Sequence, residues 1–378
     1  MISKQIGKKL KKVRLELDLT LKQAAEKLGY ENYQTLSKIE SGDRGLKATE
    51  IFKFSKVYFM DVSELLSEEF TEKKEMILWR GEPKQKEKKE IENNIRYKAK
   101  YYNLFEELLG IEKNKDYFFN INKNHIRNKN DLEKLARKTR DLLSLGNRPA
   151  LSLKEILEQD KGVKILYESL PEGSAMTIKS DEYGFVIVIN ADEAPWRRNY
   201  DLAHEFFHLL TWNIIKVDEL IKDREYLAAI EKMADQFASS LLLPKEEIEI
   251  RLRNIAKNQN NSLSLSDIID ISLDFNISTQ ALLYRMIYLE YLSWEKVQDI
   301  INSKEFKEQN KKLRWDKWGN KPRSDRFIEL AVKCLRKGLI SRGKFADLMK
   351  IDRIDIDNYI NNLGLMDNEG QTIEIMAT

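Results

Sequence analysis

The chain of 378 residues is long enough for two or three domains, and with 42% hydrophobic residues each domain can bury a core. A net charge of only +3 excludes a chain that binds nucleic acid along its whole length, and the one cysteine excludes an intrachain disulfide and a cysteine-based zinc site. The longest apolar runs are far too short to span a membrane, and no apolar stretch follows the first lysines as it would in a signal peptide. We therefore expect a cytoplasmic protein with no membrane partner.

The N-terminal stretch, residues 4–66, has the pattern of a compact all-helical unit. Apolar residues of the first helix recur on one face, Thr20 is suited to cap the second helix, and Gly29 and Gly42 are suited to end the second and third. The predicted helices cover residues 6–17, 20–28, 32–41, 47–56 and 62–66. The basic residues that precede the first acid, Glu16, predict a polyanionic partner for this unit: Lys4, Lys8, Lys9, Lys11, Lys12 and Arg14.

Two stretches of this unit resemble the XRE (lambda-repressor-like) helix-turn-helix family: L-T-L-K-Q-A-A-E-K-L-G at 19–29 and T-L-S-K-I-E-S-G at 35–42. In such a motif the second helix of the pair enters the major groove of double-stranded DNA. The resemblance implies that four side chains of the third helix contact bases or phosphates: Tyr33, Gln34, Ser37 and Lys38. The sequence departs from the family at Leu21, usually a glutamine, and in a longer turn around residues 30–32. The alternative is a helical domain that binds a protein instead of DNA.

Residues 69–130 differ in composition from the first unit and are predicted to form a charged helical connector. A lysine-rich tract surrounds Pro83, and apolar residues at helical spacing over 91–109 predict one long amphipathic helix. The pattern leaves three interpretations of this helix open: a connector, a dimerisation helix that would make the protein a homodimer, or the first helix of the next domain.

The next part of the chain combines helices with a small sheet. Helices are predicted over 132–145 and 153–159, and β-branched runs predict strands over Val163–Tyr167, Ala175–Ile178 and Phe185–Asn190. An edge strand of such a sheet would suit the capture of an extended peptide by strand addition.

The motif H-E-x-x-H follows this sheet, as His204, Glu205 and His208. Two of the three histidines of the chain therefore lie four residues apart, which places them on one face of a helix where both can bind one metal ion. Glu205 is placed to orient and deprotonate a water molecule that zinc has made more acidic. Tyr200, one turn earlier, suits either an oxyanion contact or, as we expect, core packing.

A hydrolytic zinc site needs a third protein ligand, and without a nearby cysteine or histidine this should be a carboxylate. Residues 227–243 form a helical pattern in which Glu231 and Asp235 lie one turn apart beside the apolar face. We predict that Glu231 is the third ligand and that Asp235 accepts the free N–H of a ligand histidine.

Three stretches resemble the ImmA/IrrE family of zinc metallopeptidases: V-I-V-I-N at 186–190, N-Y-D-L-A-H-E-F-F-H at 199–208 and E-K-M-A-D-Q-F-A-S-S-L-L-L-P at 231–244. The resemblance implies zinc held by His204, His208 and Glu231, Glu205 as general base, and limited proteolysis of a regulatory protein, often a repressor. The sequence departs from the family at Phe206-Phe207, where Leu-Gly is usual, and this change could narrow the cleft.

The remaining residues predict further helices that are separated by short loops. Two helices over 263–298 are split at 276–278, Trp315 and Trp318 are expected in a polar loop, and a last helical set over 325–362 suits a structural role better than a second helix-turn-helix.

Together these patterns predict an α+β protein, predominantly α. The domains are a five-helix helix-turn-helix domain (1–68), the connector (69–130), a zincin-like metallopeptidase domain (131–300) and a C-terminal helical region (301–378). We expect a DNA-binding regulator with zinc-dependent endopeptidase activity. The alternatives are a non-enzymatic transcription factor whose zinc domain is a sensor or scaffold, and the antitoxin or immunity half of a two-gene system.

Overall fold

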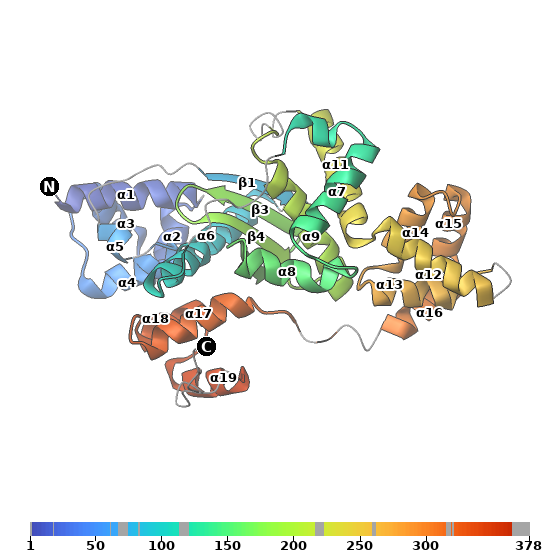
Figure 1. Cartoon of the computed structure of the whole chain (residues 1–378). Coiled ribbons are helices and arrows are strands. Elements are labelled where there is room, and N and C mark those ends of the chain that lie inside the picture. Colours follow the sequence, from blue (N-terminus) through green and yellow to red (C-terminus); the bar gives the residue numbers. More distant parts are fainter. Residues whose placement is uncertain are drawn as a thin grey trace.

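The computed structural model describes residues 2–17, 19–60, 62–66, 75–81, 84–112, 121–215, 223–258, 262–314, 319 and 321–364. Most of these residues are helical, and one four-stranded sheet lies in the middle of the molecule (Figure 1). The predicted class, α+β with a predominance of helix, is confirmed. Among the described residues, no helix is both long and apolar enough to cross a membrane.

The N-terminal unit consists of five helices, as predicted: α1 (Ile2–Glu16), α2 (Leu21–Leu28), α3 (Tyr33–Ser41), α4 (Ala48–Val57) and α5 (Val62–Leu66). The hydroxyl of Thr20 caps α2, and Gly29 ends it with a φ of +75°, in the left-handed region that favours glycine. Helices α1 and α3 approach so closely that a Cβ on Gly7 would lie 2.4 Å from the carbonyl oxygen of Ile39. Glycine at position 7 therefore allows α1 and α3 to pack closely against each other.

The sheet contains three predicted strands and one that the sequence did not reveal. Its strands are β1 (Glu75–Arg80), β2 (Lys164–Glu168), β3 (Ala175–Ser180) and β4 (Gly184–Asn190), in the order β1-β3-β4-β2. Strand β2 runs parallel to β4, and the other neighbours are antiparallel. Strand β1 lies inside the segment predicted as a helical connector. Between its charged ends the strand has only four residues, 76–79, and all of them are apolar. Their side chains pack alternately against the cores on the two sides of the sheet. The strand therefore lacks the alternation of apolar and polar residues that marks a half-buried strand in a sequence.

The long helix predicted over 91–109 is α6 (Gln85–Leu108). Its apolar side chains, among them Tyr102 and Phe105, pack in one core with Val186 and Val188 of β4. Of the three interpretations, the structure favours the first helix of the sheet-containing domain. The apolar face that a dimerisation helix would need is already buried within the chain.

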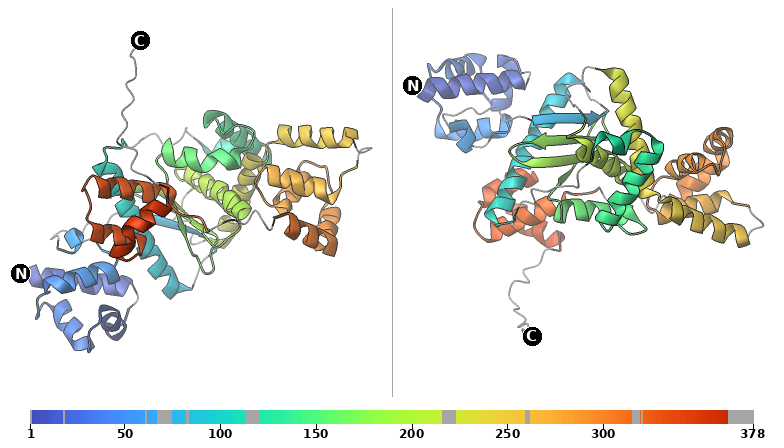
Figure 2. Two further views of the ribbon diagram at one scale, coloured as in Figure 1. Left: turned by 90° about the horizontal axis from the view of Figure 1, so that it is seen from below. Right: turned by 45° about the horizontal axis from the view of Figure 1, so that its top comes forward.

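Helices cover both faces of the sheet (Figure 2). On one face lie α7 (Lys129–Leu142), α8 (Pro149–Gln159), α9 (Pro195–Thr211) and α11 (Arg224–Leu242). On the other lie α6 and the C-terminal helices α17 (Asp325–Arg336), α18 (Arg342–Met349) and α19 (Ile356–Asn362). The rings of Phe105 and Phe327 pack 5.7 Å apart between α6 and α17. This burial against the sheet favours the structural role predicted for the C-terminal helices.

A further group of helices extends from the end of α11: α12 (Lys245–Asn258), α13 (Leu265–Asp274), α14 (Thr279–Tyr288), α15 (Trp294–Asn302) and α16 (Lys304–Arg314). Arg285 of α14 is fully buried and joins this group to α7, since its Nη2 lies 2.7 Å from Oε1 of Glu133. The described residues also form two short 3-10 helices, η1 (Lys123–Ile126) and η3 (Arg353–Asp355). The predicted loop positions Trp315 and Trp318 lie outside the described residues.

Candidate metal centre

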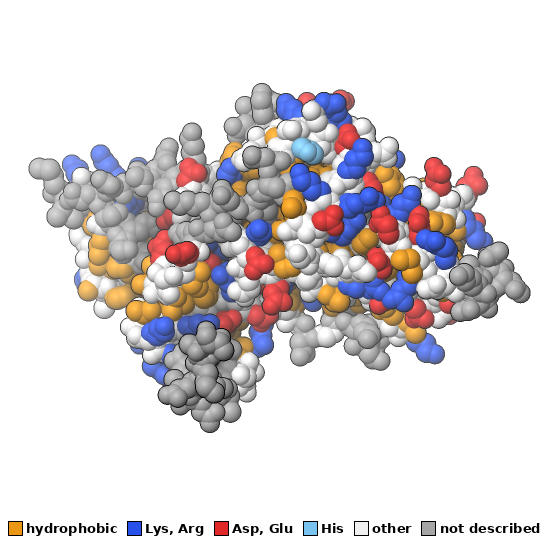
Figure 3. All heavy atoms as spheres, viewed as in Figure 1, with side chains coloured by type: hydrophobic (Ala, Val, Ile, Leu, Met, Phe, Trp, Pro, Cys, Tyr) orange, Lys and Arg blue, Asp and Glu red, His pale blue; other side chains and the backbone are white. Residues whose placement is uncertain are grey.

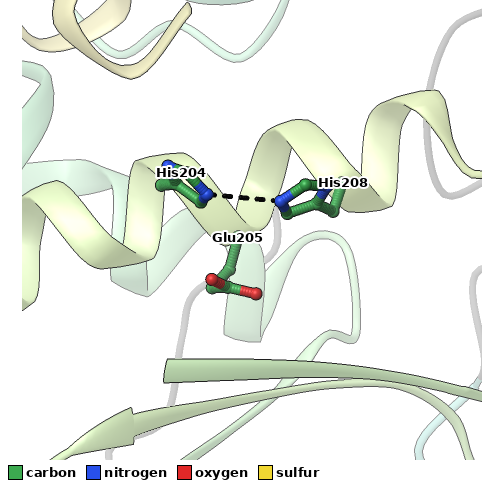
Figure 4. A group of neighbouring side chains, drawn as sticks. All are labelled: His204, Glu205 and His208. Carbon is green, nitrogen blue, oxygen red and sulfur yellow. Dashed lines mark hydrogen bonds between the residues drawn. The ribbon is translucent and has the colours of Figure 1, made fainter. Parts of the chain in front are cut away.

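Helix α9 carries the H-E-x-x-H motif through the interior of the molecule. Pro195 starts the helix, where its missing N–H costs nothing, and the residues from Asp201 to Thr211 are buried. His204 and His208 are 0% and 4% exposed. Both imidazoles lie along the same side of the helix, and the ring nitrogens face each other across one turn (Figure 4).

Three potential ligand side chains converge beside α9. The Nε2 atoms of His204 and His208 are 3.3 Å apart. In the carboxylate of Glu231 on α11, Oε2 lies 3.1 Å from Nε2 of His204 and Oε1 lies 3.3 Å from Nε2 of His208. Atoms bound to one tetrahedral zinc at about 2.0–2.1 Å are about 3.3–3.4 Å from each other. The three side chains therefore fit three corners of a tetrahedral divalent metal site, with the fourth corner left for water or substrate.

The charges at this point also suit a cation. The Nδ1 atom of His204 lies 2.8 Å from Oδ1 of Asp235, so a proton on Nδ1 leaves the Nε2 lone pair directed at His208 and Glu231. Burial alone would lower the pKa of His204, but the hydrogen bonds to Asp235 and Glu231 outweigh it and raise the pKa to about 9. Burial would raise the pKa of Glu231, yet its contacts with both histidines lower it well below the usual range. A proton or a metal ion is needed to hold these acceptors together.

Glu205 points away from the two imidazoles, towards the strands (Figure 4). Its Oε2 atom accepts a hydrogen bond from Oγ1 of Thr177 on β3 at 2.7 Å, while Oε1 is buried and has no partner among the described residues. A carboxylate oxygen of Glu205 still lies within 4.8 Å of the histidine nitrogens. One oxygen is thus anchored to the sheet, and the site has a carboxylate close enough to reach a water at the fourth corner.

Phe206 and Phe207, which the sequence suggested could narrow the cleft, are fully buried in the core instead. Their rings pack 6.2 Å and 5.5 Å from the ring of Phe237 on α11. Phe207 also touches His208 edge-on, at 5.9 Å between ring centroids. The aromatic pair therefore fixes α9 against α11 and supports the position of His208.

Around these residues lies a shell of polar contacts that the sequence revealed only in part. Asp235 occupies the predicted place beside His204, and the hydroxyl of Tyr200 donates to the backbone carbonyl of Asp235 at 2.9 Å. Tyr200 packs against the core, as expected, and its hydroxyl is engaged there. Arg80 of β1 donates to both Asp201 and Asp235. Arg80 is not recognisable from the sequence, because its place depends on the unpredicted strand β1.

The predicted DNA-contacting residues of α3 lie on its exposed side: Tyr33, Gln34, Ser37 and Lys38. Leu36 and Ile39 of the same helix are buried, which leaves this polar side free. In Figure 3, basic side chains lie along α1, whereas basic and acidic side chains are interspersed over α12–α16. The surface thus agrees with a basic N-terminal unit in an otherwise balanced chain.

Comparison with protein families agrees with the class that fold and site define, a helix-turn-helix unit followed by a metallopeptidase-like domain. Residues 10–65 match the helix-turn-helix family, and residues 158–286 match the IrrE N-terminal-like domain, a peptidase family. The chain thus contains an XRE-like helix-turn-helix domain at 10–65 and an ImmA/IrrE-like peptidase-family domain at 158–286, and both predicted resemblances are confirmed. No curated protein matches the chain. Strand β1, α6 and the C-terminal helices lie outside the matched segments.

Proposed function

We propose that the protein is a DNA-binding regulator with zinc-dependent endopeptidase activity, which cleaves a regulatory protein such as a repressor. The observation that carries the proposal is the convergence of His204, His208 and Glu231 at tetrahedral spacing, with the free oxygen of Glu205 close by. The alternatives are a regulator whose metal domain only senses or scaffolds, and an antitoxin or immunity protein. Neither alternative requires a base at position 205.

The geometry supports the following roles. His204, His208 and Glu231 hold the metal, which when bound makes water more acidic and polarises a carbonyl group. Glu205 takes a proton from the attacking water through Oε1 and later passes it to the leaving nitrogen of the cleaved peptide. The hydrogen bond from Thr177 to Oε2 keeps Glu205 in the orientation this transfer needs.

The substrate we propose is an extended peptide segment that adds to β1. This strand is at one end of the sheet, and no other described strand pairs with its outer edge. Its last residue, Arg80, contacts Asp235 beside the metal site. The opposite edge strand, β2, is less suited, because the backbone N–H of Tyr167 is already bonded to Ser324 Oγ. Strand addition would therefore bring a peptide past the metal site.

For the DNA-binding half we propose that Tyr33, Gln34, Ser37 and Lys38 contact duplex DNA. Phosphate contacts release counterions, so binding should weaken steeply as salt rises. The peptidase and DNA-binding functions have separate cores, which allows each to be removed by a single substitution.

The test compares full-length wild type with Glu205→Gln and Lys38→Glu. New protein N-termini are catalogued in cells producing each form, and zinc content and salt-dependent DNA binding are measured on each purified protein. Glu205→Gln should keep zinc and DNA binding but reduce cleavage about 100-fold to 10,000-fold. Lys38→Glu should weaken DNA binding and keep the intrinsic peptidase activity. Undiminished cleavage by Glu205→Gln would exclude this base, and the absence of wild-type-specific N-termini with unchanged gene regulation would favour a non-enzymatic regulator.

A further inference from the structure

Arg80 is the last residue of β1 and joins three elements at the metal site. Its backbone is held by pairing with Ala175 of β3, and its carbonyl oxygen accepts from the backbone N–H of Ser174 at 2.9 Å. The side chain points to the α9 face of the sheet. There its guanidinium donates to Asp201 on α9 and, at 3.0 Å, to Oδ1 of Asp235 on α11.

The contact with Asp235 leads directly to a proposed metal ligand. The same oxygen, Oδ1, receives the hydrogen bond from Arg80 and lies 2.8 Å from Nδ1 of His204. The Asp235 side chain is 50% exposed, so packing alone does not fix its rotamer. Arg80 and His204 together hold this carboxylate in one orientation. The orientation of the His204 ring then depends on a carboxylate that Arg80 keeps in place.

Asp201 supplies the anchor for Arg80. It lies one turn before His204 on α9, and its side chain is 0% exposed. A buried carboxylate needs a partner, and Arg80 makes its closest ion pair, while Arg197 is farther away at 3.5 Å. The ring of Tyr200, 5.8 Å below the guanidinium, limits its movement further. A fork of several N–H donors can satisfy both carboxylates at once, which a single ammonium group does less well.

We propose that Arg80 is a positioning residue of the metal centre: by bridging Asp201 and Asp235 it fixes the His204 imidazole for metal binding. The inference rests on the proposed function, because it takes His204 as a ligand. The role of Arg80 goes beyond that function, since this residue lies outside the matched peptidase segment. Loss of a partner that orients a ligand typically weakens metal binding or activity about 10-fold to 100-fold.

The experiment measures zinc affinity of the full-length protein by competition with a chelator, and the visible absorption of the cobalt-substituted protein as a report on ligand geometry. Arg80→Met should weaken zinc binding about 10-fold to 100-fold and alter the cobalt spectrum, with Arg80→Lys intermediate. The matched control is Arg96→Met, which removes an arginine from ion pairs with Glu75 and Glu92 away from the site. It should leave zinc affinity and the cobalt spectrum unchanged.

A double substitution tests the route through Asp235. Asp235→Asn should weaken zinc binding, and Arg80→Met should then add little, because its effect has already been removed. Fully additive losses would overturn the proposed route, as would wild-type affinity and spectrum in Arg80→Met, or an equal loss in Arg96→Met. If Arg80→Met does not fold, Asp201→Asn takes its place, since it releases the anchor of Arg80, and unchanged affinity there would overturn the inference. A wild-type protein that binds neither zinc nor cobalt would instead overturn the proposed function itself.

Discussion

The two faces of the sheet both bury charged side chains, but in opposite arrangements. On the face covered by α6 and α17, Glu106 accepts from Lys164 at 2.9 Å and lies 3.3 Å from Arg326, and all three side chains are almost fully buried. One carboxylate there lies between two cations. On the α9 face, the Nε2 atoms of His204 and His208 converge with the carboxylate of Glu231, and among the described residues no Lys or Arg forms an ion pair with that carboxylate.

This difference separates a structural cluster of charges from a candidate site. Burial alone does not mark function, because Glu106 is as deeply buried as His204 and His208. What distinguishes the α9 face is that the partners of its carboxylate are imidazoles, which can give up a proton and bind a metal ion, and not Lys or Arg. A cluster that is complete within the chain stabilises the fold, whereas an incomplete one is suited to bind something else.

The largest expected effect is on metal content. His208→Ala removes one of three converging ligands, so purified protein should fall from about one zinc per chain to almost none. The matched control is His125→Ala, the third histidine, whose Nδ1 accepts only a local backbone hydrogen bond from Asn122. Elemental analysis of both variants checks the assignment. Equal zinc in His208→Ala and wild type would remove the contrast between the two faces.

A smaller effect, on stability alone, is expected on the other face. Glu106→Ala leaves Lys164 and Arg326 buried without their shared carboxylate, which should lower the free energy of unfolding by about 3–5 kcal/mol. Zinc content should not change. The control is Glu87→Ala, which removes an exposed acid of the same helix and should lower the free energy of unfolding by less than about 1 kcal/mol. Denaturant unfolding of both variants measures the difference. Loss of zinc in Glu106→Ala would show that the two faces are not independent.

The smallest effect concerns Glu158, at the end of α8 near Arg326. Burial raises the pKa of this carboxyl from its ordinary value of 4.5 to about 7 in the folded protein. Below pH 4.5 both states hold the proton, so stability is undiminished. As pH rises towards 7 the unfolded chain ionises first, and the folded state loses relative stability. Glu158→Gln should therefore gain about 1–3 kcal/mol over wild type between pH 4.5 and 8, measured by denaturant unfolding across that range. A pH-independent difference would contradict the burial of an ionisable group there.

Much of the candidate metal site was predictable because its main residues are close in sequence. His204, Glu205 and His208 lie within one helix, and Glu231 and Asp235 are one turn apart on another, so helical periodicity alone brings each set to one face. The helix caps of the N-terminal unit and strands β2–β4 were predictable for similar local reasons. The assigned roles of these residues in metal and DNA binding stay predictions that the experiments above test.

What the sequence could not reveal depends on contacts between distant segments. Strand β1 is recognisable only through its register with β3, and the position of Arg80 follows from that register. The C-terminal helices were predicted as helices, but nothing local showed that Phe327 would pack on Phe105 across more than two hundred residues. The contact of Thr177 with Glu205 is equally non-local, because it joins a strand to a helix.

The place of β1 in the sheet also bears on how such a protein could be cut or recombined. The segment with a recognisable family pattern starts at residue 158, yet the sheet it belongs to starts at residue 75. A fragment beginning at 158 would expose the edge of β3 and lose the arginine beside the metal site. If the matched segment is expressed on its own or transferred to another gene, the stretch between the two matched domains therefore has to be included. The structural unit that contains the peptidase-family domain extends almost to the end of the helix-turn-helix unit.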